Sequence, residues 1–233
     1  MRFNNFVTES LQVNEGINDR GIFKGVFMGG TPGAGKTFVS TKIKSGSIEA
    51  KVVNIDKFIE IFGQNSYMFK DTATRVTRGQ LALHINSMLP LLLDMTSCRI
   101  NGVVRRYNIL EGFGYDLAMV FVNTSKEIAW DRIQKRARKV DKEFFEIAWR
   151  GVEETKPFLK EKFPLYIEIS NDDGMLTDTV IQDVFKKTLF FYDSPVKNPM
   201  GKEYIRVMQS NGWKYLSPNV VPFNKIREEA NRW

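Results

Sequence analysis

The glycine-rich stretch at residues 30–37 constrains the fold of this chain more than any other feature. It reads GTPGAGKT and fits the pattern G-x-x-x-x-G-K-(S/T). An apolar segment, GIFKGVFMGG, precedes it, and the segment KTFVSTKIKSG that follows has helical spacing up to Gly46. A strand, a glycine turn and a helix in this order point backbone N–H groups at an anion, with the positive end of the helix behind them. The sequence therefore predicts a phosphate-binding loop.

The residues of this loop have distinct expected roles toward ATP. Lys36 can reach the β- and γ-phosphates, and the Thr37 hydroxyl can bind Mg²⁺. A dinucleotide-binding loop would need G-x-G-x-x-G after the strand, and the chain has GKT instead. The residues expected to bind ATP here are Gly30, Thr31, Pro32, Gly33, Ala34, Gly35, Lys36, Thr37 and Phe38.

Apolar and helical segments alternate along the rest of the chain. Further strands are predicted within AKVVNIDKF, LPLLLDMTS, YDLAMVFVNTS and FPLYIEISND. These strands are continuously apolar, which is typical of a parallel sheet covered on both faces. We therefore expect an α/β fold, a three-layer α/β/α sandwich of the P-loop NTPase type. Its predicted parts are an N-terminal arm (1–20), a P-loop domain (21–195) and a C-terminal extension (196–233), packed on the domain or trailing from it.

Composition excludes several classes of function. Cys98 is the only cysteine, so an internal disulfide is impossible, and a cytoplasmic location is expected. His84 is the only histidine, which leaves almost no material for zinc chemistry or a Ser-His-Asp triad. No apolar run approaches the roughly 20 residues that span a bilayer, so no membrane partner is expected. The net charge of +7 fits an anionic partner such as a nucleotide or nucleic acid.

The class of phosphate-loop protein depends on the other motifs. A switch GTPase reads guanine with N-K-x-D, and the nearest string, at residues 224–227, reads NKIR without the aspartate. Motor ATPases normally end a strand in Asp-Glu, where the glutamate activates water. Here the third strand ends in Asp94 and Met95, so Asp94 could hold Mg²⁺ but no adjacent glutamate activates water. This pattern favours a small kinase.

A kinase also needs an acid near the acceptor hydroxyl and arginines over the transferring phosphoryl group. Asp56 follows the second strand and could orient or deprotonate the acceptor; it could also cap the next helix. Arg132 and Arg136 are spaced for one helix face, and Arg138 follows them. Guanidinium groups suit phosphate, but a solvated basic face or a nucleic-acid patch is the alternative. The predicted catalytic residues are Lys36, Asp56, Arg136 and Arg138.

Taken together, these segments resemble the small P-loop kinases over roughly residues 20–200. The stretches GGTPGAGKTF, VVNIDKF, LPLLLDMTS and GYDLAMVFVNTSKEIAWDRIQKRARKV are similar to zeta-toxin-like and polynucleotide-kinase-like proteins of large tailed bacteriophages. The resemblance implies a five-stranded parallel sheet in the order 2-3-1-4-5 with a helical, arginine-bearing lid. It also implies ATP and Mg²⁺ as cofactors and Asp56 as the catalytic base. Residues 131–136 resemble the D-R-I-x-x-R stretch at the start of the adenylate-kinase lid, which implies that Arg132 stacks on adenine and Arg136 clamps the phosphates.

The acceptor is less well defined. The family often shows D-G-T-G and then a basic residue after the third strand, whereas this chain has the bulkier DMTSCR at residues 94–99. Four arginines are candidates for gripping an anionic acceptor, or are ordinary surface charges: Arg75, Arg78, Arg105 and Arg106. A nucleic-acid end, a modified base, a nucleotide sugar and a nucleoside monophosphate all remain open as acceptors. The sequence predicts no oligomeric state.

The N-terminal arm supports a separate comparison. Its first residues, MRFNNFVTES, resemble the capsid-targeting leaders of some large tailed phages, with the pattern M-(K/R)-x-(F/Y)-x-x-F-x-x-E-(A/S). Residues 7–10 and 13–16 are similar to the sites where such leaders are cut. This resemblance implies a protein packaged in the virion and delivered to the host cytoplasm; a plain docking arm is the alternative. Two other functions also stay open, a nucleic-acid-binding P-loop ATPase and a virion protein with a vestigial kinase fold.

Overall fold

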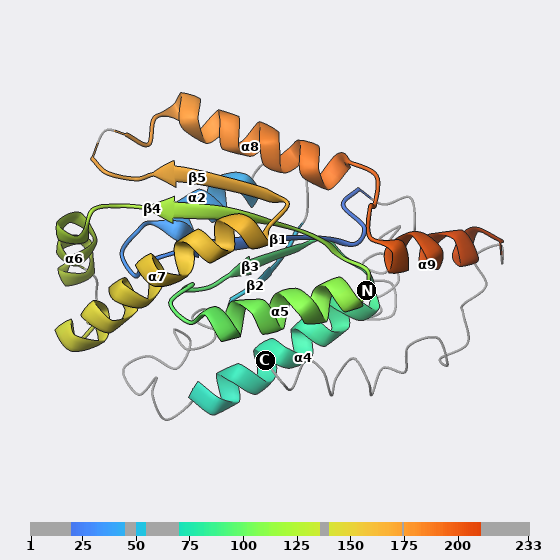
Figure 1. Ribbon diagram of the computed structural model, residues 1–233, viewed down its shortest axis with the longest axis horizontal. Helices are drawn as coiled ribbons and strands as arrows, with labels where there is room; N and C mark the ends of the chain where they lie inside the picture. The colour runs from blue at the N-terminus through green and yellow to red at the C-terminus, as the bar shows by residue number, and fades with distance from the viewer. Residues whose placement is uncertain (1–19, 45–49, 55–69, 136–139, 174, 211–233) are drawn as a thin grey trace, which may run out of the picture.

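The computed structural model describes residues 20–44, 50–54, 70–135, 140–173 and 175–210. Within them, five strands form one parallel sheet in the order β2-β3-β1-β4-β5 (Figure 1). The order 2-3-1-4-5 that the kinase resemblance implied is therefore confirmed. In spatial order the strands are β2 (Lys51–Val53), β3 (Leu91–Asp94), β1 (Lys24–Gly30), β4 (Asp116–Asn123) and β5 (Leu165–Ser170).

Helices cover both faces of the sheet, as the continuously apolar strands predicted. The helices of the described residues are α2 (Lys36–Lys44), α4 (Lys70–Asn86), α5 (Ile100–Gly112), α6 (Lys126–Gln134), α7 (Lys142–Lys162), α8 (Asp178–Asp193) and α9 (Pro199–Ser210). Buried side chains of α4, α5 and α7 share one hydrophobic core, and those of α2 and α8 share a second core. The three-layer α/β/α sandwich is thus observed (Figure 1). In the described part of the chain, no helix is long and apolar enough to cross a membrane.

Strands β1 and β4 supply alternate residues to the two cores. Phe27 points into the core of α4, α5 and α7, whereas its neighbours Val26 and Met28 belong to the other core. In β4 the same alternation places Phe121 and Val120 on opposite faces. Both strands are therefore buried on two sides, which explains why they lack the polar alternation of a half-exposed strand.

A buried ion pair fastens the C-terminal part of the chain to the start of the sheet. Lys24 is 1% exposed, and its Nζ donates to Asp116 Oδ2 at 2.7 Å. Burial lowers the pKa of Lys24, and the Asp116 carboxylate opposes that shift. Asp116 also accepts hydrogen bonds from the backbone N–H groups of Lys197 and Asn198, at 2.7 and 2.8 Å. The described part of the predicted extension, residues 196–210, is thereby held against the domain.

Replacing Asp116 with alanine should destabilise the protein by about 3 kcal/mol, because it leaves the Lys24 ammonium buried without its counterion. The matched control is Asp183→Ala, which removes an exposed pair with Lys187 at 2.7 Å and should cost less than about 1 kcal/mol. Urea unfolding would measure both variants. Equal free energies of unfolding for the two would contradict the structural role of the buried pair.

Candidate active site

The predicted site lies where the strands of the parallel sheet end. The register pairs Met28 of β1 with Asp94 of β3, and Gly30 of β1 with Val122 of β4. Because the carboxyl ends of parallel strands meet at one edge, the phosphate loop begins beside the last residues of β3 and β4. This is the edge at which such sheets bind their ligands.

Lys36 occupies the mouth of the phosphate loop. Its Nζ donates to the carbonyl oxygens of Gly30 at 3.0 Å and Thr31 at 2.8 Å, so the ammonium lies within the turn. Thr37 and Phe38 follow in the first turn of α2, and both are exposed. The structure therefore presents a cation and a hydroxyl at the N-terminal end of this helix, where an anion is favoured.

Two glycines of the loop are pressed against neighbouring parts of the protein. Gly33 has φ +85°, and a Cβ there would lie 2.3 Å from the carbonyl oxygen of Ala129 in α6. Gly35 has φ +88°, and a Cβ there would lie 2.1 Å from Nδ2 of Asn171. Any side chain at either position would be strained and would collide with its neighbour. The loop is therefore shaped from outside, by α6 and by the segment after β5.

Residues 171–173, which we call the 171–173 segment, directly follow β5 and contact the phosphate loop. Asn171 donates from Nδ2 to the carbonyl oxygen of Ala34 at 2.6 Å. Its backbone N–H donates to the carbonyl of Asn123, the last residue of β4, at 2.7 Å. One residue thus joins the phosphate loop to the edge of the sheet.

Asp172 fixes the segment to the start of α6. Its Oδ1 accepts from the backbone N–H of Ser125 at 2.6 Å and from the Thr124 hydroxyl at 2.8 Å. Both hydrogen bonds favour the charged form and hold the pKa of Asp172 below its ordinary value, the Ser125 bond most strongly.

Arg132 extends from α6 toward the same segment. Its Nη2 lies 3.2 Å from Asp173 Oδ1, and its side chain is 29% exposed. Its Nη1 is buried and has no hydrogen-bond partner among the residues that the structure describes. Since Ala129, which touches Gly33, lies one helical turn earlier, Arg132 stands beside the phosphate loop. The predicted stacking of Arg132 on adenine stays a prediction.

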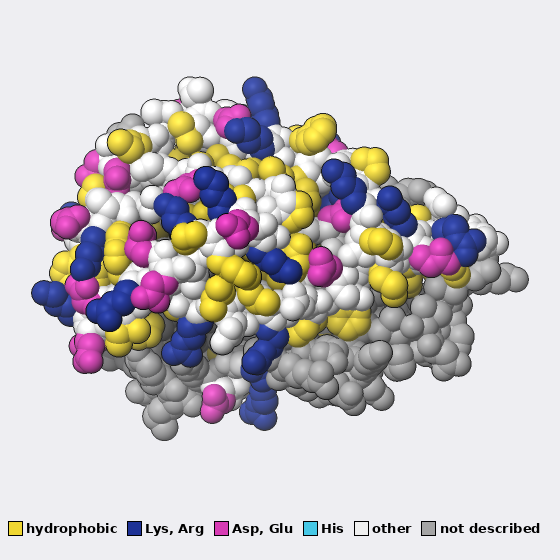
Figure 2. Space-filling view, viewed as in Figure 1, with side chains coloured by type: hydrophobic (Ala, Val, Ile, Leu, Met, Phe, Trp, Pro, Cys, Tyr) yellow, Lys and Arg dark blue, Asp and Glu magenta, His cyan; other side chains and the backbone are white. Residues whose placement is uncertain are grey.

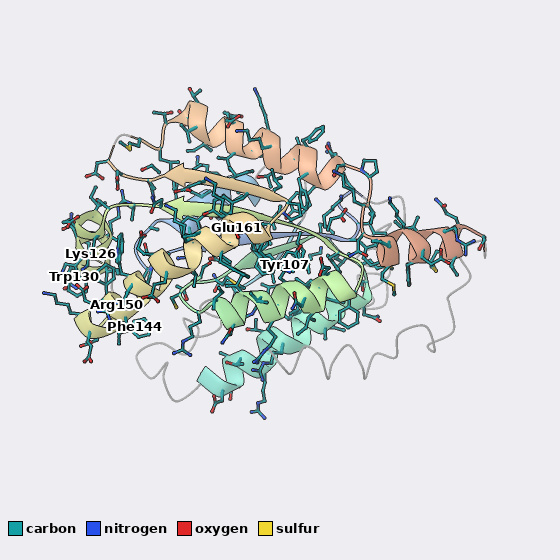
Figure 3. All side chains as sticks on the ribbon, viewed as in Figure 1. Tyr107, Lys126, Trp130, Phe144, Arg150 and Glu161 are labelled. Carbon is teal, nitrogen blue, oxygen red and sulfur yellow. The ribbon has the colours of Figure 1, made fainter. Side chains whose placement is uncertain are left out.

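Helices α6 and α7 pack on each other through a small core of their own. Ala129, Ile133 and Phe145 form its buried centre, which is separate from the two cores of the sheet. Lys126 of α6 pairs with Glu146 of α7 at 2.5 Å. Figure 3 shows Lys126 and Trp130 of α6 gathered with Phe144 and Arg150 of α7 at one end of the molecule. The element that carries Arg132 is thus a compact helical pair.

Asp94 is the last residue of β3, the strand beside β1. Its Oδ2 accepts a hydrogen bond from Asn54 Nδ2 at 2.8 Å, which joins the ends of β2 and β3. A carboxylate and the Thr37 hydroxyl are hard oxygen donors of the kind that Mg²⁺ takes together with water and substrate phosphates. The described residues contain no group of three or more His, Cys, Asp or Glu side chains that could hold a metal ion. The donor set therefore fits a Mg²⁺ ion that a nucleotide would help to bind.

The bulky loop after β3 is folded into the protein. Ser97 is buried, and its Oγ would lie 2.8 Å from a Cβ on Gly29. The Thr155 hydroxyl of α7 donates to the Ser97 carbonyl at 2.6 Å. A Cβ on Gly151 would lie 2.4 Å from the Cys98 carbonyl oxygen. Gly29 and Gly151 thus make room for this loop.

Some of the predicted acceptor arginines come together. Arg106 of α5 donates to the Gly102 carbonyl at 3.2 Å, and burial lowers its pKa, with smaller contributions from the charges of Arg78 and Arg105. Arg78 belongs to α4 and is half-buried, whereas Arg75 on the same helix is exposed. Three of the four arginines therefore share one basic region between α4 and α5.

Asp56, Arg136 and Arg138 lie outside the described residues, as does the arm before Arg20. Helix α6 ends at Gln134 with Lys135 as its C-cap, so the described helix stops before Arg136. The sequence motifs did not single out Asn54 or the 171–173 segment. The signal that could have identified the segment is its run of three polar residues directly after an apolar strand, because the end of a parallel strand lies at the ligand-binding edge of the sheet.

Comparison with known proteins gives matches at the level of family and fold. The sequence model of the zeta toxin family matches residues 11–182. The fold is similar to a protein of Chloroflexus aurantiacus assigned as a kinase, with 16% identity, a TM-score of 0.56, and coverage of 72% of this chain and 97% of the other. It is also similar to deoxyadenosine kinase of M. mycoides with bound dATP, with 17% identity, a TM-score of 0.46, and coverage of 70% and 98%. No curated protein matches the chain.

The lowered pKa of Asp172 predicts a pH-dependent contribution to stability. A carboxyl whose pKa is depressed by folding stabilises the protein above its unfolded pKa of about 4, and this contribution is lost as the pH falls through the folded value. Wild-type protein should therefore melt at a higher temperature than Asp172→Asn at pH 7, and the gap should close toward pH 3. Thermal unfolding at both pH values would test this. A gap that did not change with pH would contradict the charge effect.

Proposed function

This chain belongs to the zeta toxin family, and from that membership and its site we propose that it is an ATP- and Mg²⁺-dependent kinase. In this proposal it transfers the γ-phosphate to a hydroxyl group of a nucleotide, a nucleotide sugar or a nucleic acid. The observation that carries the proposal is the position of Lys36, held within a glycine-shaped loop at the carboxyl edge of a parallel sheet. Loops of this geometry bind the phosphates of nucleoside triphosphates.

The donor half of the proposed site uses the phosphate loop. Lys36 and the backbone N–H groups of residues 30–37 would hold the β- and γ-phosphates. Thr37 and Asp94 would hold Mg²⁺, with Asp94 acting through a water molecule. When bound, the metal ion supplies positive charge to the phosphate oxygens. The pairing of Met28 with Asp94 supports this role, because it places the carboxylate on the strand beside the one that enters the loop.

Arg132 is proposed to pack on the adenine base. Its Nη2 donates to Asp173 Oδ1 at 3.2 Å, and it lies one turn after Ala129, whose backbone contacts the phosphate loop. A planar cation of this kind stacks readily on an aromatic ring. The α6–α7 pair would then act as the arginine-bearing lid, with Arg136 and Arg138 neutralising charge on the transferring phosphoryl group. Those two arginines lie outside the described residues, so their role rests on their place in the sequence.

Asp56 is proposed to orient or deprotonate the acceptor hydroxyl. It lies outside the described residues, three positions after the end of β2 at Val53. Asn54, directly after β2, bonds to Asp94, so this strand ends at the same edge as the donor site. That placement supports an acceptor beside the γ-phosphate.

The basic region between α4 and α5 supports an anionic acceptor. Arg78, Arg105 and Arg106 bring guanidinium groups together, and such groups bind phosphate through paired hydrogen bonds. Figure 2 shows basic and acidic side chains interspersed on the face viewed. A separate prediction, packaging in a phage particle, rests on the first residues of the chain, which lie outside the described part.

The direct test of the proposed function is transfer from γ-labelled ATP to each acceptor class: a nucleic-acid end, a modified base in DNA, a nucleotide sugar and a nucleoside monophosphate. We expect label on one of these acceptors. Label recovered only as inorganic phosphate, with release stimulated by DNA, would contradict a kinase and support a nucleic-acid-binding ATPase.

Lys36→Ala should lower phosphoryl transfer by about a thousandfold or more, because the β- and γ-phosphates lose their main cation. The matched control is Lys202→Ala on α9, an exposed lysine at the opposite end of the sheet, which should keep wild-type activity. Circular dichroism would check that both variants remain folded. Wild-type turnover by a folded Lys36→Ala protein would contradict the donor assignment.

Asp56→Ala should abolish transfer while leaving the affinity for MgATP within about twofold of wild type, since the proposal places Asp56 at the acceptor and not at the donor. Labelled transfer and equilibrium nucleotide binding would be measured on the same preparation. Normal turnover by this variant would rule out Asp56 as the base.

A further inference from the structure

The 171–173 segment connects three different parts of the proposed donor site through three consecutive side chains. Asn171 bonds to the phosphate loop, Asp172 to the start of α6, and Asp173 to Arg132. Functional residues often lie on loops that a rigid scaffold positions. The arrangement suggests that this segment does more than join β5 to α8.

The contact of Asn171 constrains the phosphate loop directly. Its Nδ2 donates to the Ala34 carbonyl at 2.6 Å, and the same nitrogen fills the space beside Gly35. The residue cannot move away freely, because its backbone N–H is bonded to the end of β4. An asparagine also suits this place electrostatically. An aspartate would set a carboxylate against the Ala34 carbonyl and bring negative charge toward bound phosphates.

Asp172 holds the segment in register with α6. Its carboxylate bonds to Ser125 and Thr124, which precede the first turn of that helix. Asn171 and Asp173 lie on either side of it in the chain. A shift of Asp172 would therefore move the side chains that contact the phosphate loop and Arg132.

Asp173 acts on the other end of the proposed nucleotide site. It is 84% exposed, so its pair with Arg132 contributes little to stability. The pair does fix one edge of the guanidinium, whose other terminal nitrogen is buried. An exposed carboxylate that orients a half-buried arginine is better explained by positioning than by folding.

We propose that the 171–173 segment is a positioning element for the donor nucleotide. Asn171 sets the shape of the phosphate loop, Asp173 sets the orientation of Arg132 toward the base, and Asp172 keeps these two contacts in register. The inference rests on the proposed function, because it takes the phosphate loop and Arg132 as the two ends of a nucleoside triphosphate site. None of the three residues needs to touch the transferred phosphoryl group.

Two probes separate these roles without measuring activity. Magnesium tripolyphosphate tests the phosphate loop alone, and a magnesium complex of a non-hydrolysable ATP analogue tests the loop and the base site together. Isothermal titration calorimetry would give the dissociation constant of each probe for wild type and for the variants Asn171→Ala, Asp172→Ala and Asp173→Ala.

The three variants should give three different patterns. Asn171→Ala should weaken both probes by the same factor, about five- to tenfold for the loss of one partly buried hydrogen bond. Asp173→Ala should weaken only the ATP analogue, by about threefold or more, and Asp173→Glu should restore its binding. Asp172→Ala should weaken both probes. Asn108→Ala, the same chemical change at an exposed position on α5, should alter neither.

The outcomes distinguish the inference from the function on which it rests. If wild type binds both probes and Asn171→Ala binds them equally well, or if Asp173→Ala weakens tripolyphosphate as much as the ATP analogue, the inference is overturned. If wild type binds neither probe, the proposed function itself fails. Should Asn171→Ala not fold, the isosteric Asn171→Asp replaces it and must weaken tripolyphosphate at least as much.

Discussion

The phosphate loop keeps its shape because α6 and the 171–173 segment press on it from outside. Gly33 lies against the carbonyl of Ala129, and Gly35 lies against the amide of Asn171. Both positions combine a positive φ with a contact that leaves no space for a side chain. The phosphate loop is therefore part of a packed arrangement, and its shape depends on the neighbouring elements.

The parallel sheet provides that arrangement. Strand β1 pairs with β3 on one side and β4 on the other, so the loop emerges between the ends of two buried strands. The same edge receives Asp94 from β3, the start of α6 after β4, and the 171–173 segment after β5. Residues far apart in sequence reach one site because every strand runs in the same direction. At the opposite edge, the Lys24–Asp116 pair anchors the C-terminal segment away from this chemistry.

The sequence predicted the fold well because its signals were local. The apolar runs identified the strands, and the GTPGAGKT motif identified the loop and the helix after it. The partners of individual side chains were harder to predict, because they depend on register and packing. Asn171 and Ala34 are 137 positions apart in the chain, and no local sequence pattern predicts a contact between them. The bulky loop at Ser97 fits for a similar reason, since Gly29 and Gly151 make room for it only after the fold is formed.

The most direct test of the donor site is a crystal structure with Mg²⁺ and a non-hydrolysable ATP analogue. The proposed site predicts β- and γ-phosphates within residues 30–37, the metal ion between Thr37 and Asp94, and the base against the guanidinium of Arg132. A nucleotide whose triphosphate lies outside the loop, or whose base lies on the side of α4 and α5, would contradict it.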